Sequence, residues 1–324
     1  MEESIQLNNQ AVLLQFEGKK EDAKEYFRLS LASDPDNSIA HNNMGFLLTQ
    51  DREWGEALQH FEAALRSNPE STSAHINKAN VHLAKGEMDQ AYHHYTKAIE
   101  INPEQASSWE MYAKFFMLAN QPAEAAEAWG QAVQLKPEEA SYRIALATVL
   151  IKLERFMDAK NILDLLLLKQ PQNVSAWTQL GILYLMRKDF GSAIEVFRKT
   201  LGLEPEDETA RYHLALTYLA AGEQSKAEKE FQRLLFLYPQ HIQVRTDLAV
   251  LLLSKGELEK ALHELIYVLE IDPTYEKAIY YKGVLLYYLD RKAEAATVLD
   301  NLQKGTSPEY SEKARSFMIK YINQ

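Results

Sequence analysis

The sequence predicts an all-α solenoid, in which a 34-residue helical hairpin is repeated along the chain. The first observation behind this prediction is the spacing of the prolines. Proline ends helices, because it lacks an N–H group and disfavours helical geometry in the residue before it. Eight prolines lie 34 residues apart, at Pro35, Pro69, Pro103, Pro137, Pro171, Pro205, Pro239 and Pro273. A helix stop at a fixed period indicates one helical unit copied end to end.

The second observation is a set of small residues with the same period. If each proline takes repeat position 32, nine repeats start at residues 4, 38, 72, 106, 140, 174, 208, 242 and 276. Position 20 is alanine in all nine repeats, and position 8 is always glycine or alanine. Antiparallel helices approach closely only where side chains are small, so these positions are the predicted contact points. Position 24 is large and apolar throughout and fills the remaining volume at interior density.

The third observation concerns the end of the first helix in each repeat. Position 15 is glycine in four repeats, at Gly18, Gly86, Gly222 and Gly256. Glycine adopts left-handed backbone angles without steric cost, and helices commonly end on such a residue. Position 15 is therefore the predicted turn between the two helices of each hairpin.

The repeat pattern resembles the tetratricopeptide repeat family. Repeat six matches it best, with Trp177, Leu180, Gly181, Tyr184, Ala193, Phe197 and Pro205, and departs from it only at Thr200. The resemblance implies a right-handed superhelical α-solenoid of nine tetratricopeptide repeats over residues 4–309. A capping helix over residues 310–324 follows, and one continuous stack with no internal boundary is expected.

Composition and charge exclude several classes of function. The net charge is −11, and residues 1–105 carry 9 Lys+Arg against 17 Asp+Glu, which argues against nucleic acid and anionic membranes as partners. Cysteine is absent, which excludes disulfides, thiol nucleophiles and cysteine-based zinc sites. No signal peptide and no membrane-spanning apolar run is visible, so there is no predicted membrane insertion. A cytoplasmic location is the expectation, unless a targeting segment has been trimmed from the chain.

No enzyme motif is present, so the sequence predicts a non-enzymatic protein without catalytic residues, cofactor or metal. Two histidine pairs are spaced by one repeat: His41 with His75, and His60 with His94. They could form a metal or acid–base site. Repetition of a packing choice explains them better, because His41 and His75 occupy position 4, where other repeats carry tryptophan.

The resemblance implies that positions 2, 5, 6, 9, 12 and 13 of each first helix line a concave peptide-binding groove. Asparagines gather there in the first three repeats: Asn9, Asn43 and Asn77 at position 6, with Asn8, Asn42 and Asn80 beside them. This run resembles the asparagine ladders of importin alpha and of the O-linked N-acetylglucosamine transferase superhelix, which hold the backbone of an extended peptide. An asparagine amide offers donors and an acceptor and so matches a peptide group. The alternative is that these asparagines are merely tolerated solvated surface.

The remaining predicted groove residues are Met111, Lys114, Met186, Tyr212, Tyr280 and Tyr281. Methionine adapts to varied apolar partners and would suit an amphipathic helix. The predicted function is therefore a protein–protein interaction scaffold that binds an extended or helical segment of a partner. A substrate-recruiting partner of a separate enzyme, such as a transferase, and a self-assembling structural superhelix remain alternatives. Leu168 and Phe236, at an ordinarily polar position of the second helix, are candidates for self-association.

Overall fold

The computed structural model describes residues 2–305 and 307–322, and these residues form α-helices joined by short turns, with no strand among them. The predicted all-α class is confirmed. The helices are α1 (Glu2–Phe16), α2 (Lys20–Ser33), α3 (Ser38–Gln50), α4 (Trp54–Ser67), α5 (Thr72–Ala84), α6 (Met88–Ile101), α7 (Ala106–Leu118), α8 (Pro122–Leu135), α9 (Ala140–Lys152), α10 (Phe156–Lys169), α11 (Val174–Met186), α12 (Phe190–Leu203), α13 (Glu208–Ala220), α14 (Gln224–Leu237), α15 (Ile242–Ser254), α16 (Leu258–Ile271), α17 (Glu276–Tyr288), α18 (Lys292–Gln303) and α19 (Pro308–Phe317), followed by a π-helical turn (Met318–Ile322).

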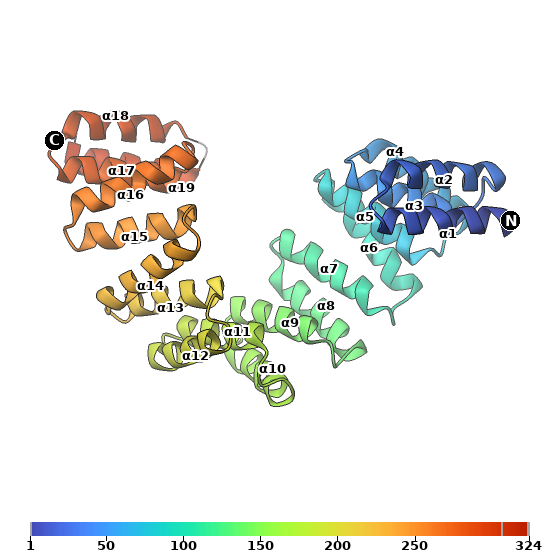
Figure 1. Ribbon diagram of the computed structural model, residues 1–324, viewed down its shortest axis with the longest axis horizontal. Helices are drawn as coiled ribbons and strands as arrows, with labels where there is room; N and C mark the ends of the chain where they lie inside the picture. The colour runs from blue at the N-terminus through green and yellow to red at the C-terminus, as the bar shows by residue number, and fades with distance from the viewer. Residues whose placement is uncertain (1, 306, 323–324) are drawn as a thin grey trace. The chain divides into compact units, whose positions relative to one another are not determined.

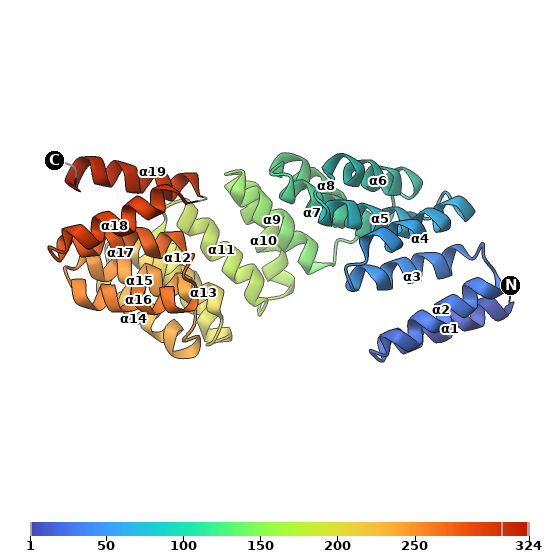
Figure 2. The same ribbon diagram turned by 90° about the horizontal axis from the view of Figure 1, so that it is seen from above.

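The chain divides into two compact units within α10, between Leu166 and Leu167. The sequence predicts one stack without an internal boundary, whereas the structure has two compact units. In each unit the helices form hairpins: α1 packs on α2, α3 on α4, α11 on α12 and α13 on α14 (Figures 1 and 2). The second helix of a hairpin then packs on the first helix of the next, as α2 does on α3 and α12 on α13.

The first helices from α3 to α17 begin 34 residues apart, at the residues where the repeats start in the sequence. In several of these helices the side chain of the preceding residue caps the helix N-terminus. Asn37 Oδ1 accepts a hydrogen bond from the Ala40 N–H at 3.0 Å, and Asn173 Oδ1 accepts one from Ala176 at 2.9 Å. Such caps satisfy backbone donors that have no partner within the helix. The division into nine repeats over residues 4–309 remains our proposal.

Small residues stand at the helix contacts of every hairpin. All nine alanines at position 20, from Ala23 to Ala295, are fully buried. A Cβ added to Gly181 would lie 2.5 Å from the ring of Phe197, so position 8 touches the large residue at position 24. The hairpin core is thus built from the residue sizes that the sequence repeats.

Every hairpin turns through a residue with left-handed backbone angles. The four glycines at position 15 have φ between 77° and 79°, and five other residues occupy the same position with φ between 56° and 62°. These five are Arg52, Asn120, Glu154, Lys188 and Asp290. The turn is therefore set by the repeat and not by glycine alone.

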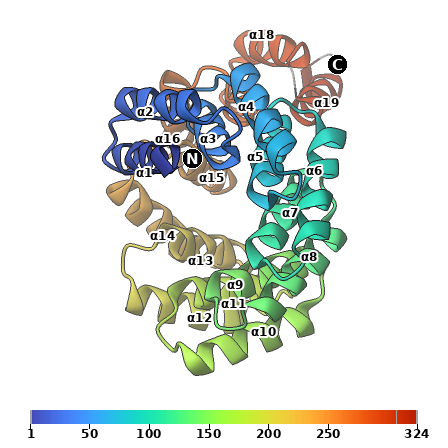
Figure 3. The ribbon, with the colours of Figure 1, turned by 90° about the vertical axis from the view of Figure 1, so that its right-hand side faces the viewer.

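The last α-helix, α19, packs on α17 and on α18. Figure 3 shows it beside α18. It begins at Pro308, so the predicted boundary between residues 309 and 310 lies inside a helix. Proline is well suited to the first turn of a helix, which explains the earlier start. Residues 323 and 324 of the predicted cap lie outside the described residues. Within the described ranges, no helix combines the length and apolar character needed to cross a bilayer.

Candidate functional site

Asparagines join neighbouring hairpins in the first unit. The Asn43 amide donates a hydrogen bond to Asn8 Oδ1 at 3.0 Å, and the Asn77 amide donates one to Asn42 Oδ1 at 3.0 Å. In both cases position 6 of one hairpin reaches position 5 of the hairpin before it. Asn8 is only 5% exposed. The predicted ladder is therefore also an internal connection between repeats.

The two hydrogen bonds between asparagines do not use every donor of their side-chain amides. An asparagine nitrogen carries two hydrogens, and the bonds above use one hydrogen of Asn43 and one of Asn77. Asn9 is exposed, and so is Asn80, which accepts a hydrogen bond from the Tyr95 hydroxyl at 2.5 Å. Donors and acceptors on exposed or half-buried asparagines thus remain along α1, α3 and α5.

Apolar side chains lie along the same helix faces. Ile39 is 64% exposed and Phe46 is 44% exposed, and both lie within one turn of Asn43 on α3. Ile5 is 50% exposed, one turn before Asn9 on α1. Residues three and four apart share a helix face, so amides and apolar side chains alternate along it.

The other predicted residues of the first unit lie on α7. Met111 is half-buried, and Lys114 is exposed and forms an ion pair with Glu110, with Nζ and Oε1 2.7 Å apart. A surface ion pair of this kind adds little stability, so Lys114 remains available to a partner.

In the second unit, the corresponding positions form a charged network. The Tyr212 hydroxyl donates to Asp247 Oδ2 at 2.8 Å, and Lys277 Nζ donates to Asp247 Oδ1 at 2.5 Å. Gln243 Nε2 donates to the Tyr212 oxygen at 2.7 Å. Tyr212 and Asp247 occupy positions 5 and 6 of successive hairpins, as Asn8 and Asn43 do.

Electrostatics follow from this network. Burial and the Asp247 carboxylate together raise the pKa of Tyr212 well above its ordinary value. Burial alone would lower the pKa of Lys277, but the hydrogen bond and charge of Asp247 outweigh it and raise that pKa. Tyr212 therefore stays a neutral donor and Lys277 a cation at neutral pH.

Aromatic residues gather where α17 meets α19. The rings of Tyr280 and Tyr281 lie edge to face with centroids 5.2 Å apart, and Tyr310 of α19 lies 6.1 Å from Tyr280. Tyr280 also borders a shallow cleft of about 480 Å³ shared with α19. Met186, at the end of α11, is 53% exposed.

The paired histidines have structural partners. His41 Nε2 lies 3.0 Å from the Pro35 carbonyl oxygen, and its Nδ1 lies 2.9 Å from His60 Nδ1. His75 makes the same two contacts with Pro69 and His94, at 3.2 and 3.0 Å. The histidines at position 4 thus connect a hairpin to the proline turn before it.

Other residue types at position 4 make the same hydrogen bond to the proline carbonyl. The indole N–H groups of Trp109 and Trp177 each donate to the proline carbonyl six residues earlier at 2.8 Å. Arg245 donates to the Pro239 carbonyl at 2.9 Å and also pairs with Glu264 at position 23. The sequence showed that these residues share position 4, but it did not show that they share a hydrogen bond to the proline carbonyl.

Burial keeps the inner histidines neutral. It lowers the pKa of His60 to about 4, with a further contribution from His41, and that of His94 to about 3, with a further contribution from Lys78. A neutral imidazole can accept a hydrogen bond, which one ring of the His41–His60 pair and one ring of the His75–His94 pair must do. Throughout the part of the chain that the structure describes, no three acidic or histidine side chains converge as a metal site would need.

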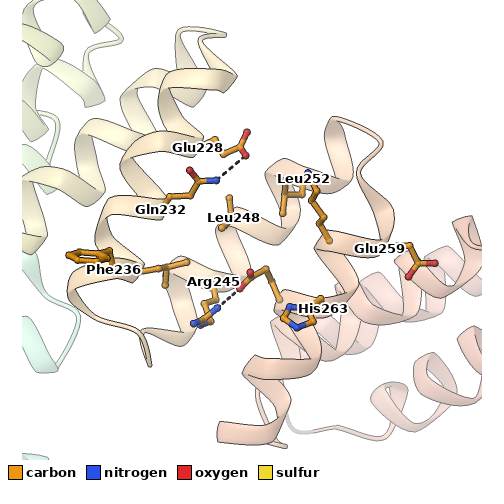
Figure 4. Close-up of a pocket in the computed structure, with 11 residues that line it drawn as sticks. Glu228, Gln232, Phe236, Arg245, Leu248, Leu252, Glu259 and His263 are labelled. Carbon is orange, nitrogen blue, oxygen red and sulfur yellow. Dashed lines mark hydrogen bonds and ion pairs between the residues drawn. The ribbon is translucent and has the colours of Figure 1, made fainter.

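The sequence did not reveal a cleft of about 740 Å³ in the second unit, lined by residues of α14, α15 and α16 (Figure 4). Phe236, which is 74% exposed, borders it, whereas Leu168, which is 78% exposed, does not. The only sequence signal was the apolar residue at position 29.

Comparisons with protein families agree with this architecture. Tetratricopeptide repeat models match residues 8–72, 72–105 and 184–251. A model described as the cytochrome c-type biogenesis protein H TPR domain matches residues 95–210. The chain is a tetratricopeptide repeat protein. The resemblance to the tetratricopeptide repeat family is thereby confirmed.

Solved structures share the fold of this tetratricopeptide repeat protein. A repeat protein from Parabacteroides merdae is 16% identical, with a TM-score of 0.56, over 72% of this chain and 93% of its own. PilF of Pseudomonas aeruginosa is 20% identical, with a TM-score of 0.54, over 65% and 96%. The APC/C hetero-tetramer Cut9–Hcn1 is 18% identical, with a TM-score of 0.54, over 82% of this chain and 52% of the matched chain. At these identities the likeness concerns the fold alone, and no curated protein matches the sequence.

Proposed function

We propose that this protein is a non-enzymatic scaffold that binds a segment of a partner protein on the exposed faces of its first helices. The observation that carries the proposal is the mixture of spare amide groups and exposed apolar side chains on α1 and α3. Asn9 lies one turn from the exposed Ile5, and Asn43 lies one turn from the exposed Ile39. Amides match a peptide backbone, and apolar side chains cover the side chains of the segment.

The chemistry of this surface favours an uncharged segment. Positions 2, 5, 6, 9, 12 and 13 of the first three hairpins carry asparagine, glutamine, serine, threonine and apolar residues, with no charged side chain. The acidic residues of this part of the chain lie at other repeat positions. Binding should therefore depend little on salt, unlike a charge clamp.

In the second unit, Met186, Tyr212, Tyr280 and Tyr281 are candidates for a separate contact. Tyrosine and methionine supply large, adaptable contact area, and Tyr212 is fixed by its bond to Asp247. Recruitment of substrates to a separate enzyme would use the same surfaces. It differs from a plain scaffold in that the captured partner would be an enzyme whose activity the chain increases.

A selection from displayed random peptides tests the proposal. Peptides that bind the protein are then measured against Asn9→Ala and Ile39→Ser, with Gln59→Ala on the exposed face of α4 as the matched control. Loss of one hydrogen bond costs about 0.5–1.5 kcal/mol, so Asn9→Ala should weaken binding by up to about tenfold. Ile39→Ser should weaken it comparably, and Gln59→Ala should leave it unchanged.

Two results would contradict the proposal. One is a set of selected peptides that bind the Asn9 and Ile39 variants as tightly as the parent protein. The other is affinity that falls steeply with salt, because the proposed surface offers no charge. A captured enzyme whose activity rises on addition of the chain would favour the recruitment alternative instead.

A further inference from the structure

The asparagine oxygens on α1, α3 and α5 are mostly occupied already. Five asparagines on these helices are exposed or half-buried: Asn9, Asn42, Asn43, Asn77 and Asn80. The Asn42 oxygen accepts a hydrogen bond from Asn77 at 3.0 Å, and the Asn80 oxygen accepts one from Tyr95 at 2.5 Å. The Asn9 oxygen accepts a longer bond, of 3.5 Å, from the residue before it. Three of the five oxygens therefore have a donor within the protein.

The amide nitrogens of the same five residues keep hydrogens for a ligand. Asn43 and Asn77 each donate one hydrogen to a neighbouring asparagine and retain the other. Asn9, Asn42 and Asn80 donate to no residue within 2–305 and 307–322. A buried N–H group without an acceptor is tolerated less than an oxygen that accepts only one bond. A ligand that covers this surface must therefore supply acceptors above all.

Proline supplies a backbone acceptor without a backbone donor. It keeps the C=O group but has no N–H, so a proline-rich segment offers oxygens to the amides and few unmatched donors. Such segments adopt the polyproline II conformation, whose backbone makes no internal hydrogen bonds. An α-helical ligand already uses its carbonyl oxygens within the helix, and a strand without proline presents as many N–H as C=O groups. The donor excess therefore favours polyproline II.

The spacing of the three helices favours the same conformation. Helix α1 packs on α3, and α3 packs on α5, so a ligand that crosses them meets the same repeat positions again on each helix (Figure 2). Packed helices lie about 8–10 Å apart. In polyproline II every third side chain points the same way, about 9.3 Å further along. A β-strand repeats its direction after two residues, or about 6.7 Å, and does not match this spacing.

Apolar residues flank the amide of position 6 on two of the helices. Position 2 carries Ile5 and Ile39, which are 50% and 64% exposed. Position 9 carries Val12, which is half-buried, and Phe46, which is 44% exposed. Positions 2, 6 and 9 lie on one helix face, so apolar side chains stand on both sides of the amide on α1 and α3. On α5 the same two positions are polar, so the apolar contact ends there.

We propose that the segment bound here is uncharged and proline-rich, and that it crosses α1, α3 and α5 as polyproline II with an apolar residue at every third position. The inference rests on the function proposed above and names the class of partner. The carbonyl oxygens of the segment accept the spare amide hydrogens, while two of every three side chains face the apolar flanks and the third faces solvent. The preformed conformation of such a segment lowers the entropy lost on binding.

Calorimetric titration of the full chain with two synthetic peptides tests the inference. One peptide contains four copies of Leu-Pro-Pro and the other four copies of Leu-Ala-Ala, and both have acetyl and amide ends. They differ in proline content but share leucine spacing, length and zero charge. We expect the proline peptide to bind at least about tenfold more tightly than the alanine peptide.

Two variants test the role of the amide donors. Asn9→Asp and Asn42→Asp remove the donors but keep an oxygen, so the bond that Asn42 accepts from Asn77 is preserved. Each should weaken binding of the proline peptide at least about tenfold, because a carboxylate repels a peptide carbonyl oxygen. Gln59→Glu, the same change on the exposed face of α4, is the matched control and should leave binding unchanged. Thermal melting establishes that each variant is folded.

The outcomes separate this inference from the proposed function. Equal affinity for the two peptides, or binding of neither, would overturn the inference. If peptides selected from the random library lack proline but still depend on Asn9 and Ile39, only the inference falls. Proline-peptide binding that is unchanged in Asn9→Asp and Asn42→Asp would also overturn it. The proposed function falls with it only if the library peptides are equally unaffected by Asn9→Ala and Ile39→Ser.

Discussion

Exchanging residues at the turn of two neighbouring hairpins gives the most direct test of how the repeat is encoded. Lys188 and Gly222 occupy the same repeat position, with φ of 62° and 79°. A Cβ added to Gly222 would meet no atom within 4 Å, so only its backbone angles oppose a side chain there. Lys188 forms no side-chain hydrogen bond or ion pair with the described residues. Lys188→Gly therefore removes the cost of left-handed backbone angles for a residue with a side chain, and Gly222→Ala adds that cost.

The expected magnitudes follow from that cost. A left-handed backbone costs a residue with a Cβ about 1–2 kcal/mol. Glycine avoids this cost, but it destabilises the folded state by about 0.5–1 kcal/mol because it loses more conformational freedom on folding. We expect Lys188→Gly to raise the free energy of unfolding by about 0.5–1 kcal/mol and Gly222→Ala to lower it by about 1 kcal/mol. One kcal/mol corresponds to a melting-point shift of about 2–4 °C for a domain of this size.

Urea unfolding and calorimetry measure these shifts. Both residues lie in the second unit, so the transition of that unit should move while the slope with urea stays constant. Lys188→Ala is the control: it removes the same side chain but keeps the strained backbone, and its stability should match the parent protein. If Lys188→Gly destabilises the protein, or Gly222→Ala has no effect, left-handed strain does not govern this turn.

Three further predictions concern the hairpin core, the asparagines and the histidines. Ala193 is fully buried, so Ala193→Phe should overpack its hairpin and cost about 1–3 kcal/mol; unchanged thermal melting would place the helix contact elsewhere. Asn43→Ala removes a donor from the buried Asn8 oxygen and should cost about 1–3 kcal/mol, and an Asn8/Asn43 double-mutant cycle without coupling would refute that bond. Burial lowers the pKa of His60 to about 4 and that of His94 to about 3, so the unfolded chain binds more protons below pH 6.5. Stability should be full above about pH 6.5 and fall as the pH drops towards these values, and the double variant His60→Gln, His94→Gln should flatten that slope in urea titrations at each pH.

Features that depend on one repeat position could be predicted from the sequence. The helix starts, the buried alanines such as Ala193 and the left-handed turn at Gly222 each follow from the size or backbone preference of a single residue. Contacts that depend on two hairpins could not be predicted in the same way. The Asn8–Asn43 bond requires knowing which side chain of the next hairpin lies opposite, and the period alone does not give that.

The cleft in the second unit could not be predicted from the sequence either. The cleft over Leu252 depends on how residues of α14, α15 and α16 lie relative to one another, and no sequence motif encodes that arrangement. The asparagines show a related limit. Residue type indicated hydrogen bonding at Asn43 and Asn77, but did not show that each already serves as a donor between hairpins. In the proposed function, the same amides would serve both stability and recognition.

The bond from position 4 to the proline carbonyl has a consequence for the ancestry and the redesign of the chain. The residue at position 23 changes together with the residue at position 4. Two adjacent hairpins pair histidine with histidine, at His41–His60 and His75–His94. Two other adjacent hairpins pair arginine with glutamate, at Arg211–Glu230 and Arg245–Glu264. Neighbours carry matching pairs, as expected if each hairpin arose by copying the one beside it. A chimaera that transfers only one member of a pair would leave a half-buried guanidinium or carboxylate without its counter-charge. The smallest exchangeable module of this protein is thus the pair together with its hairpin, and not the single residue.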